Sequence, residues 1–449
     1  MINELKDPWS LNNRIRKFVT KILIKLNILK QVLLNPKKKF LLPFKRLKRA
    51  LINPEKILNF VTLKIRTKLN SNVLPPMLDY TEGNKHIEYQ KRALITYVAF
   101  PFYSNPSTFV AGHTNGYQSI EIAKAFNRLG YKVDIVDYMD SKFIPARKYD
   151  AFFGMHYNFG RFMPYFQKST TTIYYATGTY WAFEIAAEQE RIQGLKMRRG
   201  VEISLPIRLK ENNWVEIADA VVVMGNRFNL HTYLPHRSQG NIYMIDNTAI
   251  PTLSVGDLSK KNFSSAKYNF LWFGSSGLLH KGLDLVLEAF SKIEDAHLWV
   301  CGDLESKNEQ EFLKVYRKEL FHTPNIHPVG FVDVYSDQFT QLINKCGSVI
   351  LVSCSEGQAG GILNCLKSGL IPLLSQECNT DTDGFGFTLE NNSIDEIIKA
   401  INKIKNMSTE KCFEMASKAI RVAESRYTMT QFSSNIETVL KKILSQVDV

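Results

Sequence analysis

The sequence predicts an α/β protein in which two domains, each built on a mostly parallel sheet, follow one another along the chain. Short apolar strands alternate with helical segments from about residue 92 onward. The alternation is interrupted once, by a polar, serine-containing stretch. The length of 449 residues exceeds what one hydrophobic core usually serves. We therefore expect domains at residues 76–250 and 268–425, a linker at 251–267 and a final segment at 426–449.

Residues 1–75 form a strongly basic extension ahead of these domains. Residues 1–70 hold eighteen lysines and arginines against three acidic residues, a charge of +15, so the rest of the chain contributes −1 to the net charge of +14. One face of a predicted amphipathic helix is apolar and another is basic, as shown by Ile15, Phe18, Val19, Ile22, Leu26, Leu29 and Leu33 against Arg14, Lys17, Lys21 and Lys25. Such a helix lies on an anionic membrane surface, on a partner, or on the body of the protein.

The same extension argues against two other kinds of N-terminal segment. None of its apolar runs reaches the roughly 20 residues that span a bilayer. Lysines interrupt what would be the apolar part of a secretory signal, and no small-residue cleavage site follows. We therefore expect a cytoplasmic protein that can associate peripherally with the inner face of the cell membrane.

Composition narrows the remaining function classes. Hydrophobic residues make up 45% of the chain and aromatic residues 12%, as in ordinary folded proteins. All six cysteines lie after residue 300 and none has metal-binding spacing, so we expect reduced thiols. A nucleic-acid-binding protein fits only the basic extension, and its affinity would fall steeply with salt. The neutral body has no interleaved basic and aromatic residues, so we expect no nucleic-acid partner.

The first domain is expected to alternate strands and helices. Its predicted strands are 92–100, 132–138, 149–156, 171–177 and 218–226. A helical periodicity over 118–131 stops at Gly130, and the charged segment 181–200 is also expected to be helical. This rhythm predicts a parallel sheet with helices on its faces.

The rhythm restarts after the linker. The predicted strands of the second domain are 268–276, 296–303, 325–332, 347–355 and 371–375. Its predicted helices are 281–293, 309–322 and 359–370. Open parallel sheets bind ligands at the carboxyl ends of their strands, so two such domains are expected to face one another across a binding cleft.

The second domain carries two glycine-rich turns, each joining a strand to a helix. In the first, Gly274 and Gly277 allow a backbone path that a Cβ would bar, and Lys281 at the following helix can reach a phosphate. In the second, Glu356 closes a strand, and Gly360 and Gly361 leave amide groups bare at a helix start. A glycine turn alone is commonly structural, but two in one domain indicate a diphosphate, with a carboxylate placed to accept hydrogen bonds from hydroxyl groups.

In combination these motifs resemble the donor domain of glycosyltransferase family 4, the glycosyl transferases group 1, and the resemblance extends over roughly residues 95–445. The family's first signature is a glycine turn followed by Lys-Gly, matched here by Gly274 and Lys281-Gly282. Its second contains a glutamate, a glycine and a Gly–x–Pro strand start, matched here by Glu356, by Gly360 one step late, and by the segment 369–372. Residues 325–332 resemble the family's loop beside the nucleotide base.

The resemblance implies a GT-B fold, in which two Rossmann-like domains face across a cleft and the last helix crosses back onto the first domain. It implies transfer of a sugar from a nucleotide-sugar donor to a glycan or lipid-linked acceptor, with retention of configuration, in cell-surface polysaccharide or glycoconjugate synthesis. It implies no metal or other cofactor. The chain also contains no Asp-x-Asp metal pair, no GxSxG or HExxH motif and no Walker lysine motif.

The resemblance also assigns residues. Lys281 would stabilise negative charge on the leaving nucleoside diphosphate, and Glu356 would position the sugar. Thr177 or Gly178 occupies the place of the family's histidine near the reacting carbon, so His156 is the expected substitute. The residues expected at the donor are Gly274, Ser275, Gly277, Lys281, Gly330, Phe331, Val332, Glu356, Gly360, Gly361, Ile362 and Asn364.

Two departures from the family keep a second function open. Ser275 stands where the family usually has an arginine that shares the diphosphate charge, and Asn364 replaces the second glutamate of the signature. Asparagine still forms hydrogen bonds but carries no charge. The alternative is therefore a nucleotide-sugar-binding protein without turnover, which would bind donor and release no product.

The first domain offers further candidates on a loop and a helix. The loop resembles the family's first glycine-rich loop, which faces donor and acceptor, and its residues are Gly112, His113, Asn115 and Gly116. A histidine in a turn is also commonly structural. On the helix, Glu184, Glu188, Arg198 and Arg199 fit either an acceptor site or a solvated helix face.

Overall fold

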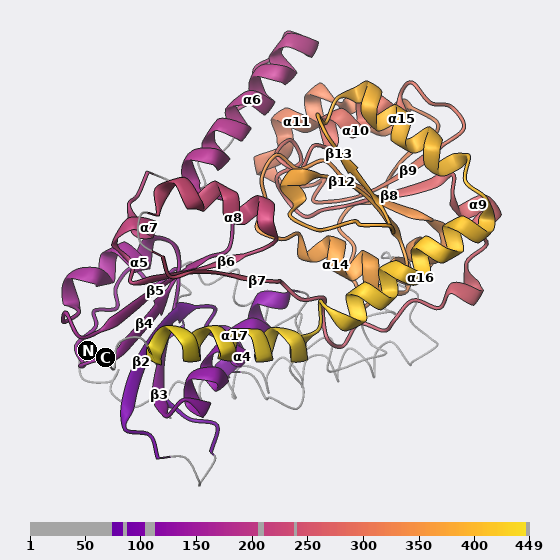
Figure 1. The fold of residues 1–449 in the computed structure, drawn as a ribbon. Coiled ribbons are helices and arrows are strands. Elements are labelled where there is room, and N and C mark those ends of the chain that lie inside the picture. The colour runs from indigo at the N-terminus through magenta and orange to yellow at the C-terminus, as the bar shows by residue number, and fades with distance from the viewer. Residues whose placement is uncertain (1–73, 84–87, 104–112, 205–210, 238–239, 446–449) are drawn as a thin grey trace, which may run out of the picture. The chain divides into compact units, whose positions relative to one another are not determined.

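The first half of the chain forms a seven-stranded sheet (Figure 1). The computed structural model describes residues 74–83, 88–103, 113–204, 211–237 and 240–445, and residues 73–449 form one compact unit. The strands are β1 (Met77–Tyr80), β2 (Lys91–Tyr97), β3 (Tyr131–Asp137), β4 (Ala151–Gly154), β5 (Thr171–Ala176), β6 (Ala220–Met224) and β7 (Ile242–Ile245). Their order is β1-β3-β2-β4-β5-β6-β7, with β1 antiparallel to β3 and every other pair parallel.

Helices cover both faces of this sheet because its strands are apolar on both sides. Within β2, Ala93 and Ile95 join one core cluster and Leu94 joins another. The first cluster lies under α4 (Thr114–Arg128) and α17 (Met429–Ser445), and the second under α5 (His156–Phe162) and α7 (Trp214–Ile217). This continuous apolar pattern is typical of parallel strands buried on both faces. The remaining helices here are α6 (Trp181–Arg199) and α8 (Arg227–Tyr233).

The second half forms a six-stranded sheet in which all pairs are parallel. Its strands are β8 (Asn269–Phe273), β9 (His297–Cys301), β10 (Ile326–Pro328), β11 (Ser348–Leu351), β12 (Ile371–Ser375) and β13 (Phe387–Leu389). Its helices are α9 (Phe263–Ala266), α10 (Leu283–Phe290), α11 (Gln310–Val315), α12 (Arg317–His322), α13 (Asp337–Lys345), α14 (Gly360–Lys367), α15 (Ile394–Lys405) and α16 (Thr409–Ser425). Segment 309–322, expected as one helix, is split into α11 and α12 at Tyr316.

The strand order of the second sheet decides where its ligand site should lie. The order β10-β9-β8-β11-β12-β13 is the doubly wound Rossmann order, which reverses direction between β8 and β11. Open sheets of this kind bind ligands beyond the carboxyl ends of the two strands at such a switch point. The two predicted glycine turns follow β8 and β11. The first sheet reverses between β2 and β4, so His156 follows a strand at its switch point.

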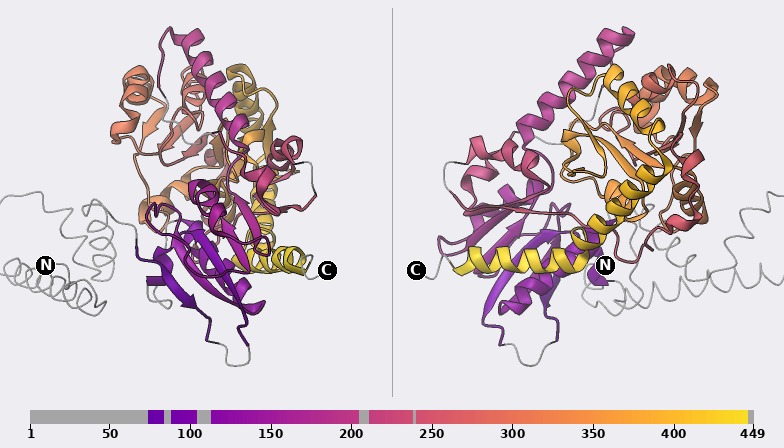
Figure 2. Two further views of the ribbon diagram at one scale, coloured as in Figure 1. Left: turned by 90° about the vertical axis from the view of Figure 1, so that its left-hand side faces the viewer. Right: turned by 45° about the vertical axis from the view of Figure 1, so that its right-hand side comes forward.

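Helix α6 begins on the first sheet and ends on the second half of the chain (Figure 2). Its Leu195 belongs to the hydrophobic core of the second half. Arg198 lies 2.5 Å from Asp284 of α10, and Arg199 lies 2.8 Å from Glu319 of α12. Arg198 and Arg199 therefore bind carboxylates of the second half, and neither the expected acceptor role nor a solvated helix face accounts for them.

Two further segments connect the halves. The expected linker packs against the second half, because Leu253 enters the core and buried Lys261 donates to the Gly369 carbonyl oxygen at 2.9 Å. Helix α17 lies beside α4 of the first half (Figure 1), where Arg128 pairs with Glu437 at 2.5 Å.

The predicted basic helix of residues 1–70 lies outside the described residues, and so does Gly112 of the glycine-rich loop. In the described part of the chain, every helix is too short or too polar to cross a membrane.

Candidate functional site

The two glycine turns of the second half meet at the switch point of its sheet. Strands β8 and β11 pair directly, and the turns after them are joined by a hydrogen bond from the Cys354 amide to the His280 carbonyl oxygen at 2.9 Å. The Lys281 ammonium lies 2.9 Å from a Glu356 carboxylate oxygen. The two side chains keep 18% and 17% of their surface exposed, so both remain within reach of a ligand. The structure therefore brings together the two residues that the sequence places at the centre of the site.

The backbone around this pair is fixed on both sides. Ser353 donates to the Glu356 carboxylate at 3.2 Å, and Asn379 donates to the Glu356 carbonyl oxygen at 2.5 Å. Gly282, directly after Lys281, has φ +70°, and a Cβ there would collide with the Val352 carbonyl oxygen. Glycine is required here both for the left-handed backbone and for the close approach of the two turns. The pair therefore sits on a constrained frame.

The start of α14 provides an anion site next to Glu356. Gly360 and Gly361 are the first two residues of the helix, and Ala359 before them supplies no side-chain cap. The amides of Ile362 and Leu363 bond to the Ala359 carbonyl oxygen, whereas those of Gly360 and Gly361 have no partner among the residues that the structure describes. Unpaired amides and the helix dipole at such an N-terminus favour a phosphate.

Asn247 connects this helix start to the start of α4 in the first half of the chain. Its amide oxygen accepts from Thr114 at 3.2 Å and from Gln118 at 2.6 Å, both in the first turns of α4. Its backbone amide donates to the Gln358 side chain at 2.6 Å, just before α14. The start of α4, which includes Asn115 and Gly116, is thereby placed next to the predicted donor site. His113 is the exposed residue before α4, and Gly116 is buried within its first turn.

The first glycine turn is not open to a phosphate in the way the sequence suggested. The amides of Gly277 and Leu278 donate to the carboxylate of Glu309, a buried residue. Gly274 donates its amide to the Cys301 carbonyl oxygen at 2.9 Å, and the Ser275 carbonyl oxygen accepts from Asp303. The expectation that two sets of turn amides converge on one diphosphate is wrong for these groups, because an internal carboxylate holds the anion position.

Three other predicted donor residues are used by the fold. Ile362 and Val332 are buried and belong to the core of the second half. Asn364 is 4% exposed, and its side-chain oxygen accepts from the Ile250 amide at 2.8 Å. In contrast, Phe331 is 69% exposed beside Gly330, which has φ +84°. Of this group, only the loop at Gly330 and Phe331 presents an open surface for a ligand.

His156 lies at the switch point of the first sheet, as the first residue of α5. Its backbone has φ +49°, a strained conformation for a residue with a side chain. Its ring packs against Tyr138, with centroids 5.8 Å apart, and burial lowers its pKa to about 4. The ring is therefore neutral at pH 7. Its ring contact is with Tyr138 of the first half, whereas Lys281 and Glu356 pair with one another in the second half.

The sequence reading missed three residues that build the site. His280 directly precedes Lys281 and is 1% exposed, Glu309 fills the first turn, and Asn247 joins the two helix starts. Only His280 carried a signal, since it is a basic residue inside the apolar run that leads to Lys281-Gly282. Glu309 lies in the short 3-10 helix before α11 and Asn247 in the segment after β7, and the partners of both are remote in sequence.

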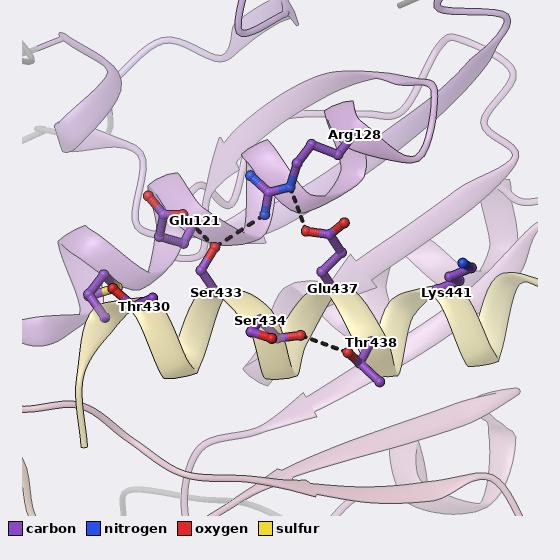
Figure 3. Close-up of a pocket in the computed structure, with 9 residues that line it drawn as sticks. Glu121, Arg128, Thr430, Ser433, Ser434, Glu437, Thr438 and Lys441 are labelled. Carbon is purple, nitrogen blue, oxygen red and sulfur yellow. Dashed lines mark hydrogen bonds and ion pairs between the residues drawn. The ribbon is translucent and has the colours of Figure 1, made fainter. Parts of the chain in front are cut away.

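A surface pocket of about 630 Å³ lies elsewhere, between α4 and α17 (Figure 3). The charged and hydroxyl groups that line it are largely satisfied by one another: Arg128 bonds to Glu437 and Ser433, and Ser433 to Glu121. It lacks the unpaired amides of the α14 start. Within the described residues, no group of three or more His, Cys, Asp or Glu is placed to hold a metal ion.

Comparison with known families matches part of the chain. Residues 255–423 match the family described as Glycosyl transferases group 1. No curated protein matches the chain. The matched range contains both glycine turns, Lys281, Glu356 and α14.

Several solved structures have a similar fold. Sucrose-phosphate synthase from Thermosynechococcus elongatus aligns with a TM-score of 0.56 at 10% identity, over 80% of this chain and 100% of that one. HepE from Anabaena in complex with UDP aligns with a TM-score of 0.53 at 13% identity, over 78% and 100%. TarM aligns with a TM-score of 0.46 at 15% identity. The aligned part covers 67% of this chain and 55% of TarM. At these identities the likeness concerns the fold.

Proposed function

We propose a specific reaction for this chain, whose residues 255–423 match the glycosyl transferases group 1, a family of nucleotide-sugar-dependent transferases. The reaction is transfer of a hexose from a nucleoside diphosphate to a glycan or lipid-linked acceptor, with retention of configuration, in cell-surface polysaccharide or glycoconjugate synthesis. The donor would occupy the second half and the acceptor the first, and the two halves would close around both.

One observation carries this proposal. The Lys281 ammonium and the Glu356 carboxylate lie 2.9 Å apart at the switch point of the second sheet, four residues before the uncapped start of α14. A donor diphosphate seated there would replace the carboxylate as the partner of Lys281 and accept from the Gly360 and Gly361 amides. These groups stabilise the negative charge that grows on the leaving diphosphate. Glu356 is then released to bind the hydroxyl groups of the sugar.

The first half would supply the acceptor side of the reaction. The neutral ring of His156 can exchange a hydrogen bond with an incoming hydroxyl group because its pKa of about 4 keeps it uncharged at pH 7. Asn247 holds the start of α4 against the segment before α14, so the start of α4 would border the donor. Exclusion of water from this region would limit hydrolysis of the donor.

A binding protein without turnover is the second candidate, and two observations favour it. Glu309 occupies the amides of the first turn, and the side-chain oxygen of Asn364 is engaged by the Ile250 amide. Together with Ser275, these leave fewer groups to stabilise the diphosphate than the family usually provides.

Donor binding and turnover distinguish the two candidates. We expect one nucleotide sugar to raise the midpoint temperature of thermal unfolding, because a ligand that binds only the folded state adds its binding free energy to the stability of that state. UDP-sugars come first, because the similar HepE structure holds UDP, and GDP- and ADP-sugars follow. The stabilising donor should release its nucleoside diphosphate when acceptor extracts are added. Stabilisation with no release over hours would establish the binding protein, and no stabilisation by any donor would contradict both candidates.

We further propose that residues 1–70 hold the protein at an anionic membrane surface, which would bring the active site to a lipid-linked acceptor. Removal of residues 1–70 takes away eighteen basic residues. The full chain should sediment with vesicles of phosphatidylglycerol and phosphatidylcholine, and the shortened chain should not. Neutral phosphatidylcholine vesicles are the control, and equal sedimentation of both chains with anionic vesicles would contradict the proposal.

A further inference from the structure

His280 occupies a position that the proposed reaction does not yet use. It lies between the two glycine turns, directly before Lys281, and is 1% exposed. Its Nδ1 lies 2.8 Å from a Glu188 carboxylate oxygen of α6. Its Nε2 lies 2.5 Å from the Ser355 carbonyl oxygen, directly before Glu356. One imidazole therefore links a helix of the first half of the chain to the turn that carries Glu356.

The two acceptors define the protonation of this ring. A carbonyl oxygen only accepts hydrogen bonds, so Nε2 must carry a hydrogen. Nδ1 faces a carboxylate, and a proton shared between them favours the ring, because imidazole has an ordinary pKa of about 6.5 and a glutamate of about 4.3. His280 is then an imidazolium with both of its donors satisfied. Burial lowers its pKa, but hydrogen bonds to Cys354 and Glu188 and the charge of Glu356 outweigh burial and raise it to about 10.

Neighbouring contacts show what this ring holds in place. The Thr179 hydroxyl group lies 2.6 Å from that of Ser355, across the two halves. Gly357 approaches Thr177 and Gly178 so closely that a Cβ on it would collide with the Thr177 carbonyl oxygen. Loss of the His280 bridge would leave the Thr179 bond, the close approach of Gly357 and the Asn247–Gln358 bonds to hold the turn at the first half. Besides Glu188, the groups that act on the charge of His280 are Cys354, whose sulfur lies 3.6 Å from Nδ1, and Glu356, both on the second turn. Lys281 follows His280 on its own turn, and Arg191 of α6 donates to the Val352 carbonyl oxygen before the second turn.

We propose that His280 is a positioning residue: as an imidazolium clamped between Glu188 and the Ser355 carbonyl, it holds the turn bearing Glu356 and Lys281 against the first half of the chain. The proposal rests on the proposed transferase function for its effect on rate, but the charge of His280 and the geometry of the halves are independent of turnover. It acts through Glu356 and Lys281 and does not touch the donor itself.

Glu188→Gln is the variant that tests it. The amide has the shape of the carboxylate and can still bond to Nδ1, but it removes the charge that stabilises the imidazolium. We expect the pKa of His280 to fall by about 2, which brings it closer to pH 7. In the parent protein, kcat should show no step from His280 between pH 6 and 8.5, since its raised pKa keeps it protonated there. In the variant, kcat should fall about tenfold as the pH rises through the lowered pKa, with little change in donor KM, and recover at pH 6.

Two control variants make the result decisive. Glu190→Gln removes an exposed carboxylate from the same helix and should leave the pH profile unchanged. His280→Gln should lower kcat at every pH. In NMR spectra of protein with isotope-labelled histidine rings, the signal that this variant loses is that of His280 among the nine histidines. A signal titrating near pH 6.5 in the parent protein, or a Glu188→Gln profile equal to that of the parent, would overturn the proposal.

A measurement without turnover separates this proposal from the proposed function. All six native cysteines are buried, so spin labels can be placed at Lys168→Cys and Lys292→Cys, which are exposed sites in the two halves. The distance distribution should be the same at pH 6 and pH 8 in the parent background and broaden at pH 8 with Glu188→Gln. An unchanged distribution would contradict the positioning role even if transfer is observed. A broadened one would support it even if no donor is turned over and the transferase assignment fails.

Discussion

Replacing Lys281 with alanine is expected to lower kcat/KM for the nucleotide-sugar donor by about 100- to 1,000-fold, the usual cost of losing one preorganised charge at a developing anion. The Lys281 ammonium lies 2.9 Å from the Glu356 carboxylate, and serine stands at position 275, where the resembled family usually has an arginine. The other cation of the first turn, the buried His280 imidazolium, has both of its donors engaged by Glu188 and the Ser355 carbonyl oxygen, so it cannot take over. Initial rates of nucleoside diphosphate release at varied donor concentration give kcat and KM separately.

The kcat and KM components report different roles of the lysine. A fall in kcat means that Lys281 binds the diphosphate more strongly in the transition state, and a rise in KM means that it also binds the ground state. Lys292→Ala removes an exposed lysine after α10 and should match the parent protein. Parent-like kcat/KM in Lys281→Ala, with donor still bound, would remove this residue from the mechanism and leave the start of α14 as the sole anion site.

The fold could be predicted from the sequence because parallel strands that are buried on both faces occur in the sequence as continuous apolar runs. Segments 132–138 and 171–177 coincide closely with β3 and β5, and 181–200 with α6. What failed was local. Tyr316 interrupts the expected helix 309–322 because its backbone leaves the helical region, with φ −101° and ψ 20°. Nothing in the helical periodicity of the segment marks that break.

The centre of the site was also readable, for a physical reason. Lys281 and Glu356 each follow a strand, and strands at a switch point deliver their carboxyl ends to one place. The sequence did not show which groups of the turns already bond to other parts of the protein. The carboxylate of Glu309 reaches Gly277 from a loop about thirty residues away, and Asn364 is taken up by the Ile250 amide. Sequence spacing reports which amides a turn exposes, but only tertiary structure shows which internal group already binds them.

The same limit applies to α6. Its alternating charges are typical of a solvated helix face, yet Arg191 and Arg198 both bind Asp284, which is fully buried. Desolvation makes buried ion pairs weak contributors to stability, but their geometry fixes how two elements meet. Helix α6 brings Glu188 to His280 and its arginines to α10. We therefore interpret it as the element that fixes the position of one half relative to the other.

The relative position of the two halves should also affect the rate. Gly357→Ala is expected to lower kcat by about 100-fold, the usual cost of misplacing reacting groups by about 1 Å. An added Cβ on Gly357 would collide with the Thr177 carbonyl oxygen, a backbone atom that cannot rotate away. The clash is relieved only if the turn bearing Glu356 withdraws from the first half. The start of α14 and Lys281 stay within the second half, so donor binding should change by only a few-fold.

Donor titration by calorimetry and initial-rate measurements on the same preparation distinguish misplacement from unfolding, since a misfolded variant would lose both. Gly240→Ala is the matched control, because a Cβ there meets nothing within 4 Å and its backbone lies outside the left-handed region. If Gly357→Ala transferred sugar at the parent rate, the close approach of Gly357 to Thr177 could not belong to the reactive arrangement. The positions of Glu356 and Lys281 relative to the first half would then have to be set by α6 and Asn247 alone.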